Sequence, residues 1–264
     1  MGIIGISAAI VGGLGILIGL ALGFAERLFA VKTDERELAV RQALPGNNCG
    51  GCGFAGCEAL AKAIARGEAN ANACPVGGSE VAAQIAAIMG VEADEAKRQV
   101  AFIHCAGTCD KVKLAYHYYG APDCRQAAIA PGHGGKACSF ACFGLGTCVK
   151  TCPVDAIFLQ DGVAVVDPKA CIGCTACTKV CPQGIIGLRP KEAYVEVRCS
   201  SHATGKAVKA VCGAGCIGCG ICQKICPTDA IHVVDHLARV DHEKCIACGA
   251  CVEKCPVDII RVLS

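Results

Sequence analysis

The sequence predicts an α+β chain built from several small parts, and three observations carry this prediction. The N-terminus is an uncharged run, residues 2–24. The chain of 264 residues contains 25 cysteines, most of them in short C-x2-C groups. A pair of short apolar segments around a turn occurs twice, each time between two cysteine groups. This internal repeat favours two duplicated α+β units, each organised around its cysteines.

The N-terminal run predicts a single-pass transmembrane anchor, residues 1–30. A helix from Ile3 to Phe24 would rise about 33 Å, enough to span a bilayer. A cleaved signal peptide is the alternative, but its basic first segment is missing and the apolar run is long. Lysines and arginines follow only on the C-terminal side. The positive-inside rule then places the bulk of the chain on the cytoplasmic side of the inner membrane.

The motif C-x2-C-x2-C-x3-C-P occurs twice near the C-terminus, from Cys216 to Pro227 and from Cys245 to Pro256. It is the ligand pattern of a bacterial ferredoxin with two [4Fe–4S] clusters, in which the fourth cysteine of each motif ligates the other cluster. The predicted ligand sets are Cys216, Cys219, Cys222 and Cys255, and Cys226, Cys245, Cys248 and Cys251. Structural zinc or disulfides are the alternatives, and neither needs the third and fourth cysteines at these offsets.

An earlier group with the spacing C-x2-C-x4-C-x16-C predicts another [4Fe–4S] site, with zinc as the alternative. Its ligands would be Cys49, Cys52, Cys57 and Cys74. A short alanine-rich helix, residues 58–66, is expected between the last two, ending at Gly67. Two matches to G-x-G-x-x-G, beginning at Gly51 and Gly213, overlap cysteine ligands and follow no clear strand. They are therefore read as false positives for dinucleotide binding.

A second ferredoxin-like unit precedes the C-terminal one and is defective, because Leu145 stands where the second cysteine of its first motif belongs. The complete motif of this unit, together with one cysteine of the defective motif, predicts a cluster on Cys152, Cys171, Cys174 and Cys177. The defective motif leaves three ligands for another cluster, Cys142, Cys148 and Cys181. Hairpins are expected at residues 156–166 around Asp161-Gly162, and at residues 230–240.

Six cysteines remain outside these sets: Cys105, Cys109, Cys124, Cys138, Cys199 and Cys212. Cys138 is the nearest in sequence to the defective motif and is assigned as its fourth ligand. An extra cluster is assigned to Cys105, Cys124, Cys199 and Cys212, which leaves Cys109 spare. The chain would then carry about six [4Fe–4S] clusters on 24 cysteines. His104 and His133 lie near the scattered cysteines, where exposed loop histidines are commoner than ligands.

The predicted organisation has six parts: anchor 1–30, [4Fe–4S] domain 31–80, helical or irregular segment 81–136, first ferredoxin-like unit 137–190, insert 191–211, and second ferredoxin-like unit 212–264. In the middle segment we expect helices at residues 79–89 and 92–99, the first with Ser79 as N-cap and Gly90 as its end. A strand at residues 100–104 should deliver Cys105.

The formal charge of +2 counts thiols as neutral. Six clusters at about −2 each would bring the net charge of the loaded chain to about −10. The charge of the cluster-free chain is therefore a poor guide to partners, and no nucleic acid is expected among them. Iron–sulfur clusters also imply a reducing compartment.

With these motifs in place, the chain resembles the B subunit of the Rnf complex, a membrane-bound ferredoxin:NAD+ oxidoreductase that pumps Na+ or H+. The extra cysteines resemble the cluster-rich form of this protein found in anaerobes. The resemblance implies that soluble ferredoxin and other Rnf-type membrane subunits are partners. It also implies a translocase subunit that has redox clusters but no other catalytic residue. NAD+ would be reduced on another subunit, in keeping with the missing nucleotide-binding motif. The alternatives are a polyferredoxin subunit of another membrane enzyme, such as a hydrogenase, and a storage or regulatory iron–sulfur protein.

Overall fold

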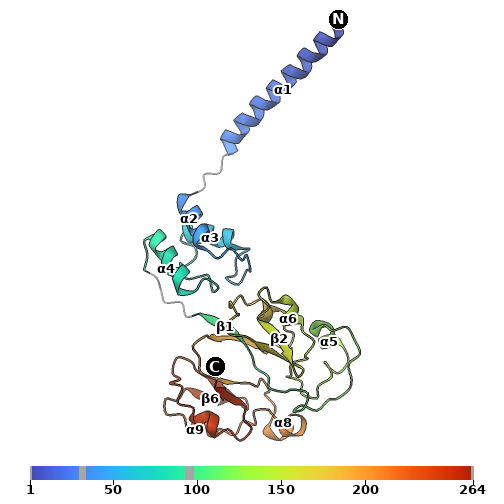
Figure 1. Cartoon of the computed structure of the whole chain (residues 1–264), viewed down its shortest axis with the longest axis vertical. Coiled ribbons are helices and arrows are strands. Elements are labelled where there is room, and N and C mark those ends of the chain that lie inside the picture. Colours follow the sequence, from blue (N-terminus) through green and yellow to red (C-terminus); the bar gives the residue numbers. More distant parts are fainter. Residues whose placement is uncertain (1, 30–33, 93–97, 263–264) are drawn as a thin grey trace.

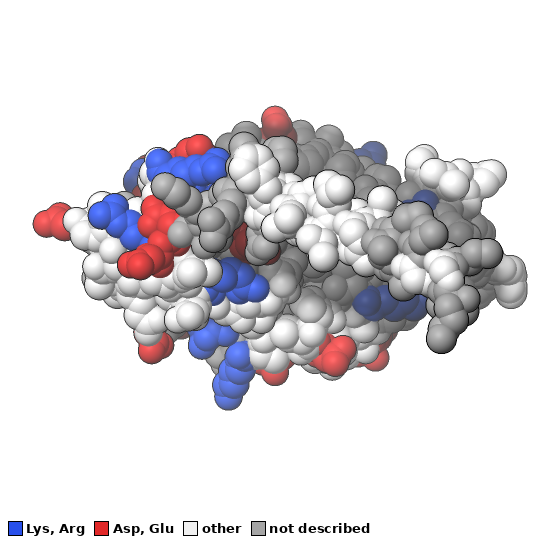
Figure 2. All heavy atoms as spheres, turned by 90° about the horizontal axis from the view of Figure 1, so that it is seen from above, with Lys and Arg blue, Asp and Glu red and all other residues white. Residues whose placement is uncertain are grey.

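The computed structural model describes residues 2–29, 34–92 and 98–262, without the side chains at positions 3–4, 6–11 and 26–29. Helix α1 (Gly2–Phe29) lies apart from the other elements (Figure 1). On the face seen in Figure 2, basic and acidic side chains are interspersed rather than gathered by sign.

The expected transmembrane anchor at residues 1–30 is corrected by the structure. Among the residues that it describes, no helix combines the length and the apolar character that crossing a membrane requires. A crossing takes about 20 consecutive apolar residues, or about 30 Å of helix. The remaining elements mix helices and strands, as the α+β expectation requires.

Three helices form a small domain after α1: α2 (Glu35–Ala43), α3 (Cys57–Ala65) and α4 (Gly78–Met89). The Asp34 carboxylate caps α2 by accepting a hydrogen bond from the Arg36 N–H, 3.0 Å away. Leu60, Ile64 and Ile85 are fully buried between these helices. The expected helix at 58–66 is thus confirmed within one residue at each end.

Helix α4 confirms the expectation for residues 79–89, and Gly90 ends it in the left-handed conformation. Its N-cap is Gly77 rather than Ser79, which lies inside the first turn. A side chain at position 77 would collide with Val81. Most of the second helix expected here, residues 92–99, lies outside the described residues, and Gln99 itself belongs to a strand.

Two units of the same plan make up the rest of the chain, each with an outer pair of antiparallel strands and an inner hairpin. The first unit has the outer pair β1 (Gln99–Ile103) with β4 (Ile186–Pro190) and the hairpin β2 (Ile157–Gln160) with β3 (Val163–Val166). The second unit has β5 (Val195–Val197) with β8 (Ile260–Val262) and β6 (Ile231–Val234) with β7 (Leu237–Val240). The repeat therefore begins one strand upstream of each cysteine motif.

Both expected hairpins are confirmed, and their turns explain their sequences. Asp161 and Gly162 have φ of 49° and 76°, and Asp235 and His236 have φ of 47° and 64°. Two consecutive positive φ angles define the type I′ turn, whose twist matches that of the flanking strands. Asp and Gly are residues that tolerate this conformation.

Six short helices lie in the two units. They are α5 (Cys124–Ile129), α6 (Thr147–Thr151), α7 (Ala176–Val180), α8 (Gly205–Val211), α9 (Ile221–Lys224) and α10 (Ala250–Glu253), and all of them except α8 contain one cysteine. Each unit packs its cysteines into its own apolar core, with Val100, Ile157 and Val163 in the first and Val195, Ile231 and Leu237 in the second. In such small cores a bound cluster would replace side chains that a larger domain would supply.

Candidate metal centres

The cysteines of the two C-terminal motifs gather as the ferredoxin pattern predicts. Burial, with smaller contributions from the neighbouring thiols of Cys216, Cys219 and Cys255, raises the pKa of the Cys222 thiol to about 11. The second group surrounds a pocket lined by Cys226, Cys245, Cys248 and Cys251. In both groups the fourth cysteine comes from the other motif, so the crossed ligand sets are brought together in space.

The complete motif of the first unit behaves in the same way. Burial, with smaller contributions from Cys171, Cys174 and Cys152, raises the pKa of the Cys177 thiol to about 11. The Cys152 sulfur accepts a hydrogen bond from the Ala156 N–H at 3.3 Å, and the equivalent Cys226 sulfur accepts one from Ala230 at 3.2 Å. These matching bonds place the cysteine before each proline in the same orientation.

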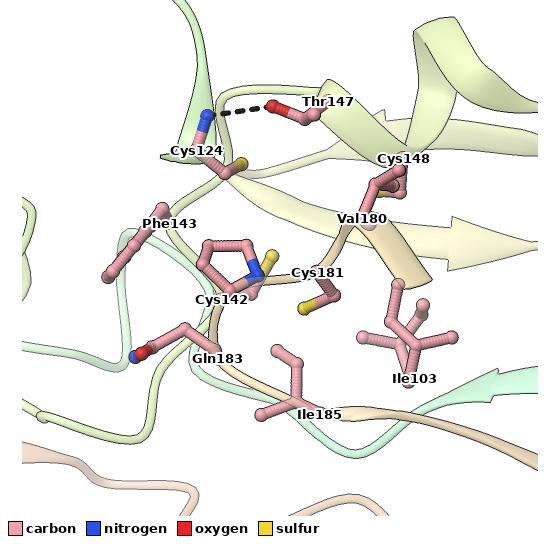
Figure 3. Close-up of a pocket in the computed structure, with 13 residues that line it drawn as sticks. Ile103, Cys124, Cys142, Phe143, Thr147, Cys148, Val180, Cys181, Gln183 and Ile185 are labelled. Atoms are coloured by element: carbon pink, nitrogen blue, oxygen red, sulfur yellow. Dashed lines mark hydrogen bonds between the residues drawn. The ribbon is translucent and has the colours of Figure 1, made fainter. Parts of the chain in front are cut away.

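The defective motif receives its fourth cysteine from outside the motif. A pocket of the first unit is lined by four thiols, Cys124, Cys142, Cys148 and Cys181, and by apolar side chains; we call it the Cys124 pocket (Figure 3). Burial, with smaller contributions from the other three thiols, raises the pKa of Cys148 to about 12. The sequence assigned Cys138 to this place, whereas the structure brings Cys124 there.

Cys124 is held in this position by two neighbouring polar side chains. It is the first residue of α5, and Asp123 caps this helix by accepting hydrogen bonds from the N–H groups of Arg125 and Gln126. The Thr147 hydroxyl accepts a hydrogen bond from the Cys124 N–H at 2.7 Å, shown dashed in Figure 3, and donates one to Asp123 at 3.3 Å. Helix α6 begins at Thr147, so this bond ties α5 to the helix that carries Cys148.

Four of the other scattered cysteines line a second pocket, at the junction of the two units. Its four thiols are Cys105, Cys138, Cys199 and Cys212, and we call it the bridging pocket. Burial, with smaller contributions from Cys105 and Cys216, raises the pKa of Cys199 to about 11. Cys109, the cysteine expected to be spare, is exposed and lines neither pocket.

The bridging pocket is built symmetrically from the two units. Cys105 and Cys199 each lie two residues after the first strand of their unit, β1 or β5. Cys138 and Cys212 each lie four residues before the first motif cysteine, Cys142 or Cys216. This shared spacing was the signal in the sequence that could have grouped Cys138 with Cys105. Cys124 has no counterpart, because the first unit has 20 more residues in this segment than the second (105 to 138 is 33, and 199 to 212 is 13).

Hydrogen bonds to sulfur join the bridging pocket to the motif cysteines on both sides. The Cys105 sulfur accepts hydrogen bonds from the N–H groups of Gly107 and Cys142, both at 3.4 Å. The Cys199 sulfur accepts them from Ser201 at 3.4 Å and from Cys216 at 3.3 Å. N–H groups aimed at cysteine sulfurs are what a thiolate-ligated cluster uses to stabilise its negative charge.

The first cysteine group lies against the first unit. Burial raises the pKa of Cys74, and Cys57 and Cys52 raise it further, so these three thiols lie together. Cys49 is among the thiols that, after burial, raise the pKa of Cys174 in the first unit. A side chain at Gly51 would come within 2.7 Å of the Cys174 carbonyl oxygen, so this close approach of the two backbones requires glycine.

The two histidines near the scattered cysteines have different environments. Burial lowers the pKa of His104, whose Nδ1 lies 3.1 Å from the Val197 carbonyl oxygen. Its Nε2 lies against Gly187, and His104 also lines the bridging pocket. His133 lines neither the Cys124 pocket nor the bridging pocket.

The donor set fits cubane clusters better than single ions. Within the described ranges, no three His, Cys, Asp or Glu side chains are gathered tightly enough to hold one metal ion. A [4Fe–4S] cluster takes four thiolates, and each of three pockets is lined by four cysteines.

Comparisons with known protein families agree with this donor chemistry. Residues 44–76 match a model described as a putative Fe-S cluster domain. Residues 137–185 and 215–259 match one described as a 4Fe-4S dicluster domain, and a second model of that description matches residues 170–231. The matches cover the groups for which the motifs predict clusters.

Three relatives extend the likeness over most of the chain. The B subunit of the Na+-translocating ferredoxin:NAD+ oxidoreductase complex of Acetobacterium woodii is 44% identical, over 90% of this chain and 72% of the relative. The B subunit of the ion-translocating oxidoreductase complex of Methanosarcina acetivorans is 43% identical, over 90% of both chains. The B subunit of the proton-translocating ferredoxin:NAD+ oxidoreductase complex of Clostridium ljungdahlii is 44% identical, over 86% of this chain and 81% of the relative.

The chain belongs to the family of B subunits of ion-translocating oxidoreductase complexes. The resemblance inferred from the motifs is thereby confirmed. A member of this family is part of an oxidoreductase, and iron–sulfur electron transfer is the chemistry that its cysteine domains support.

Proposed function

We propose that this chain is the electron-transfer arm of a membrane-bound, ion-translocating ferredoxin:NAD+ oxidoreductase. It accepts electrons from reduced soluble ferredoxin and delivers them to the membrane subunits of the complex. The assignment to ferredoxin and NAD+ draws on the names of the relatives from Acetobacterium woodii and Clostridium ljungdahlii. Its cysteine domains work on the cytoplasmic side of the membrane, because iron–sulfur clusters need a reducing compartment.

The observation that carries this proposal is the continuous series of cysteine groups. The second unit contacts the bridging pocket through the Cys216 N–H and the Cys199 sulfur. The bridging pocket contacts the Cys124 pocket through the Cys105 sulfur and the Cys142 N–H. The first unit in turn contacts the N-terminal domain at Gly51. A storage protein has no need for groups linked in this way.

We assign ligands to six [4Fe–4S] clusters from this arrangement. The four sets expected from complete motifs and from the N-terminal group are retained. The other two are Cys124, Cys142, Cys148 and Cys181, and Cys105, Cys138, Cys199 and Cys212. Bound there, the clusters supply one-electron transfer at negative potentials. The chain's own part is to hold the sulfurs, to aim N–H groups at them and to exclude water with apolar side chains.

The exposure of the cysteines suggests where electrons are received. Cys219 and Cys248 of the second unit are exposed, whereas Cys142, Cys148 and Cys171 of the first unit are buried. Exposed Ile221 and Ile246 lie in the same two cysteine loops. A partner protein can therefore approach the second unit closely, and the N-terminal domain is the part that delivers electrons onward.

The first test is the amount of iron and acid-labile sulfide on anaerobically purified chain. Six clusters require about 24 atoms of each per chain. Zinc with little sulfide contradicts the proposal. The second test is reduction of the loaded chain by reduced ferredoxin within its complex. Transfer of these electrons to flavin-bearing subunits supports the proposal, whereas co-purification with a nickel protein favours the hydrogenase alternative.

A further inference from the structure

A buried lysine lies at the junction of the Cys124 pocket and the bridging pocket. These are the two pockets whose cysteines the sequence analysis assigned wrongly. Lys136 is only 8% exposed. Its Nζ donates hydrogen bonds to the Gly107 carbonyl oxygen at 2.8 Å and to the Gly162 carbonyl oxygen at 2.7 Å. Among the described residues it forms no ion pair with a carboxylate. A buried charge without a counter-charge is costly, so its position calls for an explanation.

One carbonyl partner of Lys136 lines the bridging pocket, and the other lies next to the loop that follows Cys142. Gly107 lines the bridging pocket and donates its N–H to the Cys105 sulfur. Gly162 lies against Gly144, in the loop that follows Cys142 of the Cys124 pocket. Lys136 therefore stands beside the Cys105–Cys142 hydrogen bond that joins the two pockets.

This positive charge breaks the symmetry of the bridging pocket. Lys136 lies two residues before Cys138, and the equivalent position before Cys212 is Ala210. Two other cations are near, Arg198 in the lining of the bridging pocket and exposed Lys111 next to Val112 of that lining. Charges that are exposed or partly buried are screened by water more strongly than a buried one, so Lys136 should have the larger effect on the pocket.

We propose that the Lys136 ammonium stabilises the reduced forms of the clusters in the bridging pocket and the Cys124 pocket, and so draws electrons toward the first unit. The inference rests on the proposed function. A reduced cluster has one more negative charge than an oxidised one, and a nearby cation in a low-dielectric site favours that form.

The test is an EPR-monitored redox titration of the full chain, purified anaerobically, with iron and sulfide measured on each sample. In Lys136→Met we expect unchanged iron and two clusters that are harder to reduce. The reduction equilibrium constant of each should fall about tenfold, a shift of about 59 mV for one electron. Lys209→Met, which removes an exposed lysine from α8 beside the bridging pocket, should leave every potential unchanged. Wild-type potentials in Lys136→Met overturn the inference.

Two further variants separate charge from packing if Lys136→Met loses iron. Lys136→Gln keeps a hydrogen-bond donor without the charge, and Lys136→Arg keeps the charge. Clusters retained at wild-type potentials in Lys136→Arg, but lost or harder to reduce in Lys136→Gln, support the inference. Equal losses in both variants show a packing role and overturn it. Wild-type chain without sulfide instead contradicts the proposed function itself, so the two failures are distinguishable.

Discussion

The two ferredoxin-like units share one plan but complete their metal centres differently. In the second unit every motif cysteine is present, and Cys219 occupies the position that Leu145 occupies in the first. In the first unit Cys124 arrives from α5, inside the 20 additional residues, and lines the pocket in place of the missing motif cysteine. Cys219 and Cys248 of the second unit are exposed, whereas Cys174, the counterpart of Cys248, is buried and lies against Gly51 of the N-terminal domain. A ligand lost from a motif can thus be replaced by one on an insertion.

The largest expected effect comes from Cys124→Ala. A cubane cluster needs four ligands, so the Cys124 pocket with three thiols should lose between one iron and the whole cluster of about four irons. Iron and sulfide analysis, together with EPR spectra, measures this loss. Cys109→Ala is the matched control, since Cys109 is exposed and outside both pockets. A full complement of iron and unchanged spectra in Cys124→Ala would show that the first unit completes its site in another way.

The pairing of the scattered cysteines is sharpened by a double variant. Cys124 and Cys138 line different pockets, so the losses of iron in Cys124→Ala and Cys138→Ala should add in the double variant. Each single variant should also remove a different EPR signal. If both cysteines served one cluster, the double variant would lose no more iron than the more damaging single variant.

A smaller effect is expected at the contact between the N-terminal domain and the first unit. In Gly51→Val the new side chain would press on the Cys174 carbonyl oxygen, a clash that costs about 1–3 kcal/mol if the domains stay together. The domains should therefore separate, and the magnetic interaction between their reduced clusters in EPR should weaken. Ala55→Val, on an exposed position of the same loop, should leave this interaction intact. Unchanged interaction in Gly51→Val contradicts the direct contact.

The smallest effect is expected for Thr147→Val. This change removes the acceptor of the Cys124 N–H and should cost about 1 kcal/mol. Iron should then be lost to a chelator about fivefold faster, since 1 kcal/mol corresponds to about that factor. The equivalent residue of the second unit is Ile221, whose side chain has no oxygen that could accept such a hydrogen bond. Ile221→Val should not change the rate of iron loss. Equal rates of iron loss in the two variants would show that Thr147 does not help to hold Cys124 in place.

Much of the chain could be predicted from local pattern. The second unit has its four ligands per cluster within two short motifs, so spacing alone paired them correctly in space. The hairpin at Asp161-Gly162, the helix after Cys57 and the strand before Cys105 also follow from short-range preferences. The prediction of a transmembrane anchor was wrong for the described residues. The uncharged N-terminal run nevertheless correctly predicted a helix.

The kind of metal chemistry, the repeat and the family could all be predicted from the sequence alone. The signals for them, motif spacing and turn residues, depend only on residues a few positions apart. The tertiary structure decided which unit each scattered cysteine serves, since Cys124 and Cys138 are both close in sequence to the defective motif. It brought β1 onto β4 and β5 onto β8, which set Cys105 and Cys199 facing one junction. It also buried Lys136 there. Contacts between segments 30 to 90 residues apart depend on the packing of whole units, which no local spacing encodes.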